Sequence, residues 1–436
     1  MAGTNSRRWK CEAAVENKFS EWGFFNPGVS RRASRMIIWF CVIPSNAQAA
    51  ADEAASLRAL KAGDIEAARS IIRGWVSRDP KDIGAWLRLA GIARKAGHVS
   101  EALEALESAL RIDPRCFPAL LMLATVRESL GDARAAAHHY SVAIAQAPPT
   151  WQIEPSALAA LEHGRGLVER HNRELRDFIH ASISDTRSEC ATTEQKRIDT
   201  FIDLTLRIRK SYVQQPMEFC YPGLPSIEFY DRAHFPWLEA LEAESGEIRR
   251  ELLSILGEGG EGFAPYINYS DQIPLDQWRE LNRSPKWTAW HFFDRGEPIE
   301  DRLKKAPATA AALAKLPQPT VPRRSPSALF SALTPKTRIP PHTGVANFRV
   351  LVHLPLVIPR GCGFRVGGET REWRYGEAWI FDDTIEHEAW NDSDDLRVIL
   401  ICDIWSPFLS PSEREAVRAI IDARDQYTGA SPTPLL

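Results

Sequence analysis

Residues 339–359 read IPPHTGVANFRVLVHLPLVIP and decide the fold of the C-terminal part of the chain. An apolar run with alternating character begins after Gly344, and it is rich in Val and Leu. A short run of this kind, bounded by proline and glycine, predicts a β-strand. His342 precedes this predicted strand and His353 lies inside it, so the histidines belong to a β region.

Further short apolar segments lie on both sides of this strand, separated by turn residues. They are ALFSAL (328–333), FRVG (364–367), EWRYG (372–376), AWIFDD (378–383) and LRVILICDIW (396–405). Several short strands with turns between them predict an antiparallel sandwich or barrel. Among these folds, the double-stranded β-helix, or jelly roll, fits best. The stretch SPSEREAVRAIIDARD (410–425) predicts a closing helix with Ser410 or Ser412 as its N-cap.

The N-terminal part of the chain carries a repeat with a period of 34 residues. Three residue types recur at this spacing: Gly63, Gly97 and Gly131; Ala68, Ala102 and Ala136; Pro80, Pro114 and Pro148. Between glycine and proline each unit has an amphipathic helical pattern. Glycine ends the first helix of a pair, the small alanine lets two helices approach closely, and proline closes the second helix.

This pattern resembles the tetratricopeptide repeat family over residues 49–150. The unit with Trp86, Leu89, Gly97 and Ala102 carries the family's residue types at the matching positions. The resemblance implies an α-helical solenoid with a curved surface that binds a peptide or protein. A role as a spacer or a dimer interface is the alternative.

The composition is that of an ordinary globular protein and argues against nucleic acid as a partner. The 436-residue chain has 44% hydrophobic and 25% charged residues and a net charge of −3, which is typical of a globular protein with two or three domains. Nucleic acid is not expected as a partner, because such binding needs a concentrated basic surface. The seven cysteines form no CxxC pair, which favours a reducing compartment.

Three of the eleven histidines, His342, His353 and His387, lie within 46 residues in the β region. Two histidines on separate strands that face one cavity are the usual start of a non-haem Fe(II) site. In many such sites a carboxylate stands two residues after the first histidine, but this chain has Gly344 there. Each histidine taken alone could instead be structural.

The residues around these histidines resemble the aspartyl/asparaginyl β-hydroxylase family over about residues 216–415. The segments that carry the resemblance are FYDRAHFPWLEAL (229–241), NFRVLVHLPLVIP (347–359) and GEAWIFDDTIEHEAWNDSDDLRVILICDIWSPFLS (376–410). Enzymes of this family are Fe(II)- and 2-oxoglutarate-dependent dioxygenases that bind iron through two histidines and no carboxylate. The resemblance therefore implies that His342 and His387 are the metal ligands, with water in the third position.

The resemblance also implies which residues hold the co-substrate. Arg397 would bind the far carboxylate of 2-oxoglutarate, and Ser331 and His353 match further positions that contact it. Arg349 would bind an acidic side chain of the substrate. Some members of the family have a second arginine where this chain has Leu351, which leaves the substrate preference open.

Simpler roles exist for several of these side chains. Arg397 could form a salt bridge with Asp403 or Asp382, and Ser331 could be an ordinary strand residue. Asp382 and Asp383 could orient an imidazole or a bound water, or they could cap the turn before His387.

The sequence thus predicts a dioxygenase that hydroxylates a peptide or protein side chain, Asp or Asn at the β-carbon, with succinate and CO2 as co-products. The repeats would help to hold the substrate. Three alternatives are a halogenase with chloride in place of the carboxylate, a hydroxylase of a lipid-linked acyl chain, and a repeat scaffold with an inactive oxygenase domain.

These patterns divide the chain into five parts. They are a disordered extension (1–45), the repeats (46–150), a helical connector that ends before Pro216 (151–215), the oxygenase domain (216–415), and a C-terminal helix and tail (416–436). No transmembrane segment is expected, and the predicted location is the cytoplasm. Residues 31–50 resemble a signal peptide, so export stays open.

Overall fold

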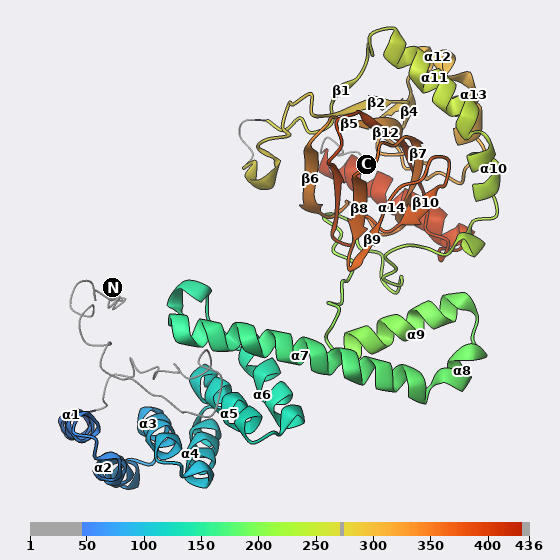
Figure 1. Ribbon diagram of the computed structural model, residues 1–436. Helices are drawn as coiled ribbons and strands as arrows, with labels where there is room; N and C mark the ends of the chain where they lie inside the picture. Colours follow the sequence, from blue (N-terminus) through green and yellow to red (C-terminus); the bar gives the residue numbers. More distant parts are fainter. Residues whose placement is uncertain (1–45, 271–273, 430–436) are drawn as a thin grey trace. The chain divides into compact units, whose positions relative to one another are not determined.

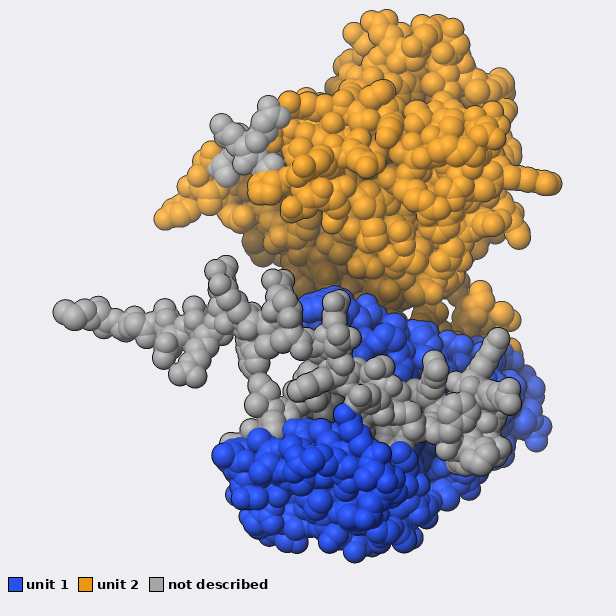
Figure 2. All heavy atoms as spheres, turned by 60° about the vertical axis from the view of Figure 1, so that its left-hand side comes forward, with its two compact units in different colours: residues 1–190 blue, residues 191–436 orange. Residues whose placement is uncertain are grey.

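The computed structural model describes residues 46–270 and 274–429. The chain forms two compact units, one up to Cys190 and one from Ala191 onward, and Figure 2 colours them separately. The predicted N-terminal extension, residues 1–45, lies outside the described residues, as does most of the signal-like stretch. Among the described residues, no helix is long and apolar enough to cross a membrane.

In residues 46–190, the described part of the first unit, the regular structure is helical (Figure 1). Three helix pairs follow one another in the order that the repeat predicts, and a longer helix follows them. The helices are α1 (Ala47–Lys61), α2 (Ile65–Arg78), α3 (Ile83–Lys95), α4 (Val99–Ile112), α5 (Phe117–Ser129), α6 (Ala133–Ala145), the short η1 (Thr150–Gln152), α7 (Pro155–Ser182) and α8 (Ser184–Ser188).

The repeated residues explain the helix pairs. Gly63, Gly97 and Gly131 stand in the tight turns within the pairs, with φ of 82°, 81° and 77°. Glycine adopts these left-handed angles without the steric cost that other residues carry. The three repeated alanines are completely buried, as close packing of two helices requires. The prediction of a tetratricopeptide-like helical region is confirmed.

The connector between the two parts differs from its prediction. The last helix before the β region, α9 (Thr192–Thr205), ends well before Pro216, and residues 206–215 contain no helix. The prediction of a helical connector up to residue 215 was therefore wrong in this segment. From Gln215 onward, backbone N–H groups donate to loops of the β region instead of continuing a helix.

The second unit is built around two antiparallel sheets (Figure 1). The larger sheet has the order β1-β2-β5-β12-β7-β10, and the smaller has the order β6-β11-β8-β9. The strands of the larger sheet are β1 (Ala264–Pro265), β2 (Trp287–His291), β5 (Ala328–Leu333), β7 (Arg349–Val357), β10 (Trp379–Phe381) and β12 (Arg397–Trp405). Those of the smaller sheet are β6 (Thr337–His342), β8 (Cys362–Val366), β9 (Glu369–Arg371) and β11 (His387–Asn391). A separate hairpin consists of β3 (Phe293–Asp294) and β4 (Glu297–Pro298).

Helices cover the outer face of the larger sheet. They include α10 (Leu238–Ala243), α11 (Ser245–Gly257) and α13 (Pro307–Leu313), which share a hydrophobic core with β5, β7 and β12. The remaining helices are the short η2 (Arg232–His234), η3 (Asp276–Trp278) and α12 (Glu300–Lys305), and the closing helix α14 (Pro411–Thr428), which Ser410 caps as predicted.

Side chains of the larger sheet alternate between two cores. On β12, Val398 and Leu400 pack toward the helices, whereas Ile399 and Ile401 pack toward the smaller sheet. Because successive side chains of a strand point to opposite faces, Arg397 shares the face of Ile399 and Ile401. The same alternation places Ser331 and His353 on the face toward the smaller sheet. The three predicted co-substrate residues therefore project into one interior.

Candidate active site

The two predicted metal ligands lie side by side at the ends of neighbouring strands. His342 is the last residue of β6 and His387 is the first residue of β11, and the two are partners in the antiparallel register. Their ring centroids are 4.1 Å apart, with 52° between the ring planes. The rings are therefore close enough to share one metal ion, although 45 positions separate them in the sequence.

Hydrogen bonds with the backbone fix the tautomer of both imidazoles. Nδ1 of His342 lies 2.8 Å from the carbonyl oxygen of Pro340, and Nδ1 of His387 lies 3.1 Å from that of Ile385. A carbonyl oxygen only accepts, so in each ring Nδ1 carries the hydrogen and Nε2 carries the lone pair. Metal-binding histidines are typically oriented in this way.

Burial keeps both imidazoles neutral. It lowers the pKa of His387 to about 4, and together with the neighbouring His387 it lowers the pKa of His342 well below the ordinary value. A metal ion binds the neutral form of histidine, so neither side chain has to lose a proton at neutral pH. The chemistry of this donor pair fits a divalent transition metal such as Fe(II).

The position that a ligand carboxylate would need is already filled. A Cβ atom on Gly344 would collide with the carboxylate of Asp383, which comes from the loop before His387. Asp383 forms a buried ion pair with Arg349, with 2.9 Å between Oδ2 and Nη2. Among the residues that the structure describes, no group of three His, Cys, Asp or Glu side chains is arranged to hold a metal.

The predicted co-substrate residues meet deeper in the same interior. Nη1 of Arg397 lies 3.4 Å from the carbonyl oxygen and 3.5 Å from the hydroxyl of Ser331. Its guanidinium lies over the ring of Trp373, 5.0 Å from the centroid, and the His353 ring lies 6.0 Å from that of Trp373. Burial lowers the pKa of Arg397 to about 10, which still leaves it charged at neutral pH. His353 is neutral, because burial and the nearby Arg397 lower its pKa well below the ordinary value.

Three buried nitrogen atoms in this group have no hydrogen-bond partner in the described part of the chain, and those of Arg397 and Trp373 are donors. Nε of Arg397, Nδ1 of His353 and Nε1 of Trp373 are buried, and none has a partner among the described residues. A buried donor without a partner costs about 1–3 kcal/mol, and more when it is charged. A carboxylate bound here would satisfy such donors, so the group fits one end of 2-oxoglutarate.

The simpler roles weighed for Arg397 are not those seen. Asp403 accepts hydrogen bonds from Ser325 and from the backbone of Ser327. Asp382 accepts from the backbone and the hydroxyl of Thr384, and so caps the turn before His387. Neither carboxylate is paired with Arg397 in the hydrogen bonds and salt bridges of the described residues.

Two family models match segments of the chain. The family model "Aspartyl/Asparaginyl beta-hydroxylase" matches residues 242–407, and a "Tetratricopeptide repeat" model matches residues 59–125. The resemblance to the aspartyl/asparaginyl β-hydroxylase family is confirmed. All the residues of the site described above lie within the matched segment, which we call the hydroxylase segment.

The relatives are matched over only part of their lengths. The aspartyl/asparaginyl β-hydroxylase of Mus musculus is 40% identical over 149 residues, which cover 34% of this chain and 20% of that protein. The ornithine lipid ester-linked acyl 2-hydroxylase of Rhizobium tropici is 32% identical over 195 residues, 44% of this chain and 65% of that protein. The aspartate β-hydroxylase domain-containing protein 2 of Xenopus tropicalis is 30% identical over 213 residues, 48% of this chain and 55% of that protein.

An aromatic wall stands beside the histidine pair of the hydroxylase segment, and the sequence did not indicate it. Trp278 packs its edge against His342, with 5.1 Å between ring centroids, and Trp287 lies 6.5 Å from the same histidine. Tyr266 stacks on Trp287 at 4.1 Å. The side chain of Gln277 closes this loop onto the strand by donating to the carbonyl of Pro341 at 3.0 Å.

The structure changes the interpretation of two residues, Trp373 and Arg349. Trp373 was not predicted as a site residue, because one tryptophan among many carries no signal of its own. Arg349, predicted to bind substrate, is 1% exposed and pairs with Asp383 behind Gly344. A contact between Arg349 and an acidic substrate stays a prediction.

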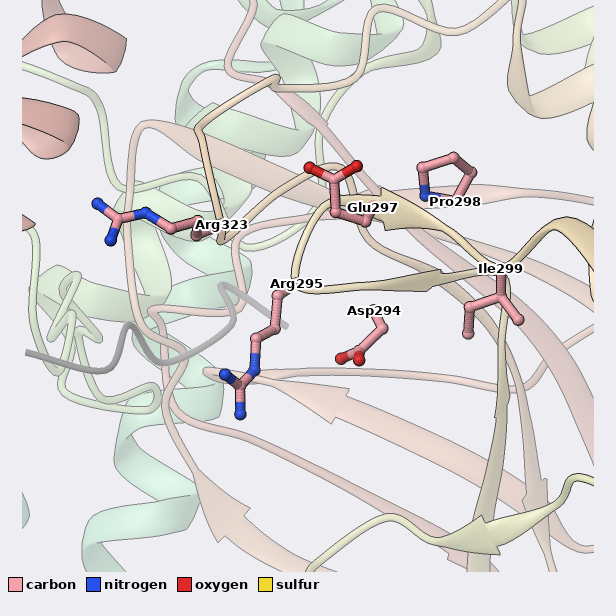
Figure 3. A pocket seen from close by; sticks show the side chains of 6 residues that line it. All are labelled: Asp294, Arg295, Glu297, Pro298, Ile299 and Arg323. Carbon is pink, nitrogen blue, oxygen red and sulfur yellow. The ribbon is translucent and has the colours of Figure 1, made fainter.

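A surface hollow of about 510 Å³ lies elsewhere in the second unit, at the hairpin of β3 and β4 (Figure 3). It is lined by Asp294, Arg295, Glu297, Pro298, Ile299 and Arg323. It shares no residue with the histidine pair, and Arg323 is paired with Asp422 at 3.6 Å. Charges of both signs alternate around it, so it selects no ligand class.

Proposed function

We propose that the second unit is an Fe(II)- and 2-oxoglutarate-dependent dioxygenase that hydroxylates a peptide or protein side chain. The observation that carries the proposal is a pair of neutral imidazoles with ring centroids 4.1 Å apart, each with its Nδ1 hydrogen-bonded to a backbone carbonyl and its Nε2 left to bind a metal. The strand orders β5-β12-β7-β10 and β6-β11-β8-β9 support the predicted double-stranded β-helix.

His342 and His387 would bind the iron, and solvent would complete the third protein position. With 2-oxoglutarate bound, the metal supplies the activation of O2, and succinate and CO2 are the co-products. The side chains of the protein form the surroundings of the metal. Asp383 and Arg349 fill the space beside Gly344, so a side chain at position 344 would have no room to serve as a third ligand.

Arg397 would hold the far carboxylate of 2-oxoglutarate, assisted by Ser331, His353 and the indole N–H of Trp373. Charge-assisted hydrogen bonds in a buried site are about twice as strong as neutral ones. The bound anion would also satisfy the donors that are otherwise without acceptors. Burial of the subsite excludes water from the co-substrate's far end.

We assign peptide or protein as the substrate class because the same chain carries the repeats. Tetratricopeptide repeats commonly bind peptide partners, and residues 59–125 match that family. The repeats would hold a substrate or its protein carrier, and hydroxylation at the β-carbon of Asp or Asn follows from the family resemblance.

Turnover by matched variants tests the proposal. The full chain, supplied with Fe(II), ascorbate, 2-oxoglutarate and a panel of Asp- and Asn-containing peptides, should form succinate and a product 16 Da heavier. His342→Ala and His387→Ala should both abolish it, and His234→Ala, outside the site, should not. Variants of the pair that turn over at the wild-type rate would refute the site.

A lipid substrate is the second candidate, because the Rhizobium tropici relative carries the name of an acyl 2-hydroxylase. The same assay with an ester-linked acyl lipid in detergent distinguishes the two. A scaffold without activity would bind no stoichiometric Fe(II), and metal analysis of the purified protein decides that point.

A further inference from the structure

Two loops carry the histidine pair, and they touch each other directly. One follows His342 and runs to Asn347, and the other runs from Asp382 to His387. The backbone N–H of Gly344 donates to the carbonyl of Asp383 at 2.6 Å. The pairing of His342 with His387 in neighbouring strands and this contact between the loops therefore both bear on the distance between the two imidazoles.

A third segment is hydrogen-bonded to both loops. We call residues 214–221 the strap; they follow α9 and lie upstream of the hydroxylase segment. The N–H of Gln215 donates to the carbonyl of Thr384 at 2.7 Å, in the second loop. The N–H of Met217 donates to the carbonyl of Gly344 at 2.9 Å, in the first loop.

One side chain of the strap bridges the loops on its own. The amide of Gln214 donates through Nε2 to Oδ2 of Asp382 and accepts through Oε1 from Nδ2 of Asn347 at 2.9 Å. Asn347 and Asp382 are almost completely buried. Asn347 also accepts from the N–H of Tyr221 at 2.6 Å, so the strap is fastened to the first loop at both of its ends.

The strap is also anchored away from the loops. Glu218 pairs with the buried Arg324, which forms two hydrogen bonds with Asp425 of α14, at 2.7 and 3.0 Å. This ion-pair group holds the strap against a helix that does not contribute to the site. Displacement of the strap would break contacts at both places.

We propose that the strap is a positioning element for the metal site, with Gln214 as its positioning residue. Gln214 acts through the two loops, and in the part of the chain that the structure describes it forms no hydrogen bond with either imidazole. Without its two hydrogen bonds, the loops keep the strand pairing of His342 with His387, their direct contact and the backbone bonds of the strap. This inference rests on the proposed metal-binding role of His342 and His387.

The chain offers a matched control at the next position. The side chain of Gln215 is exposed, and its backbone N–H alone contacts the second loop. Gln215→Ala should therefore behave as the wild type. Gln214→Ala removes the bridge, and Gln214→Met removes its hydrogen bonds while it keeps the length of the side chain.

Co(II) titration of the full chain measures the effect. Partners of metal ligands typically change metal affinity 10- to 100-fold, so Gln214→Ala and Gln214→Met should bind Co(II) about tenfold more weakly. Amide hydrogen exchange in the metal-free proteins should be faster at Gly344 in both variants and unchanged in Gln215→Ala.

Each outcome decides the question. Wild-type affinity and exchange in Gln214→Met would overturn the proposal, as would a Gln214→Met protein that fails to fold, because Gln214 would then act on the whole domain. If the wild type binds no metal, the proposed function fails, whereas the exchange measurement still decides the role of the strap.

Discussion

At the scale of single residues, the missing carboxylate and the buried ion pair are two parts of one arrangement. Gly344 leaves room that the Asp383 carboxylate occupies, and Arg349 neutralises that carboxylate in a place where an unpaired charge would be costly. Glycine is required here because a side chain would have no room, and not because the backbone adopts a left-handed angle. The chain thus fills the position beside the candidate metal site with a carboxylate that is already paired.

Gly344→Asp supplies the carboxylate that many iron sites have, yet we expect it to damage the site. Its Cβ would displace Asp383, and a second carboxylate would compete for Arg349. Overpacking of this kind costs about 1–3 kcal/mol. Thermal unfolding should show a less stable second unit, and Co(II) titration should show weaker binding. The double variant with Asp383→Ala moves the carboxylate from one loop to the other and should recover part of the stability; further loss would contradict this account.

Trp373→Phe tests the indole donor of the co-substrate group. Phenylalanine keeps the ring that stacks on Phe364 and Trp379 but lacks the N–H. Loss of one hydrogen bond is worth about 1 kcal/mol, so the dissociation constant of 2-oxoglutarate should rise about fivefold. Equilibrium binding in the presence of Mn(II) measures this. Trp379→Phe, which changes a half-buried neighbour, is the control and should leave the affinity as it is.

A pH effect on stability is expected from Asp382. Burial raises the pKa of this carboxyl from 3.8 to about 6, and the nearby Asp383 adds to the shift. The folded protein therefore holds the proton more tightly than the unfolded chain. The stabilisation is complete below the unfolded pKa and is lost as the pH rises through about 6. Two pKa units correspond to about 3 kcal/mol.

Asp382→Asn removes this titration. From pH 7 to pH 4, the wild type should gain up to about 3 kcal/mol of unfolding free energy relative to the variant. Urea unfolding of both proteins at several pH values measures the difference. If the gap between them is the same at every pH, Asp382 is not the group responsible.

At the scale of elements, structure that depends on local residue patterns can be predicted from the sequence, whereas structure that depends on long-range contacts cannot. Gly63, Gly97 and Gly131 determine turns through their own backbone angles, so the helix pairs could be predicted. The strands could be recognised by their apolar runs. Residues 215–221 could not, because their conformation depends on hydrogen bonds with loops more than 120 positions away.

The residues of the candidate site also divide into those that the sequence indicates and those that it does not. His342, His387 and Arg397 carry chemistry that a pattern can indicate, and a family resemblance supplied their roles. Trp278, Trp373 and Gln214 act through their neighbours in space. Their contacts depend on how two sheets and a strap pack together, which a single sequence does not encode at fixed spacing.

The anchor of α14 gives a prediction at this scale. Asp425 is 1% exposed and binds Arg324 through both oxygens. Asp425→Ala leaves a buried arginine with Glu218 as its remaining strong partner, so we expect a loss of about 3 kcal/mol from the second unit. Asp422→Ala, three residues earlier, removes a more exposed ion pair of 3.6 Å and should cost less than about 1 kcal/mol. Chemical unfolding compares the two, and equal losses would contradict the role of the buried pair.

At the scale of the whole molecule, the two units have separate hydrophobic cores. Leu106 is completely buried in the core that α1 to α5 share, whereas Leu400 is buried between the larger sheet and its helices. Leu-to-Ala substitutions in cores of this kind cost about 2–5 kcal/mol.

Because the two cores are separate, we expect two calorimetric transitions in the full chain. Leu106→Ala should lower the temperature of one, and Leu400→Ala should lower that of the other. Co(II) should raise only the transition that Leu400→Ala lowers, because a ligand stabilises only the unit that binds it. A single transition that moves with either substitution would mean that the units unfold together, and the repeats would then contribute to the stability of the metal site as well as to binding.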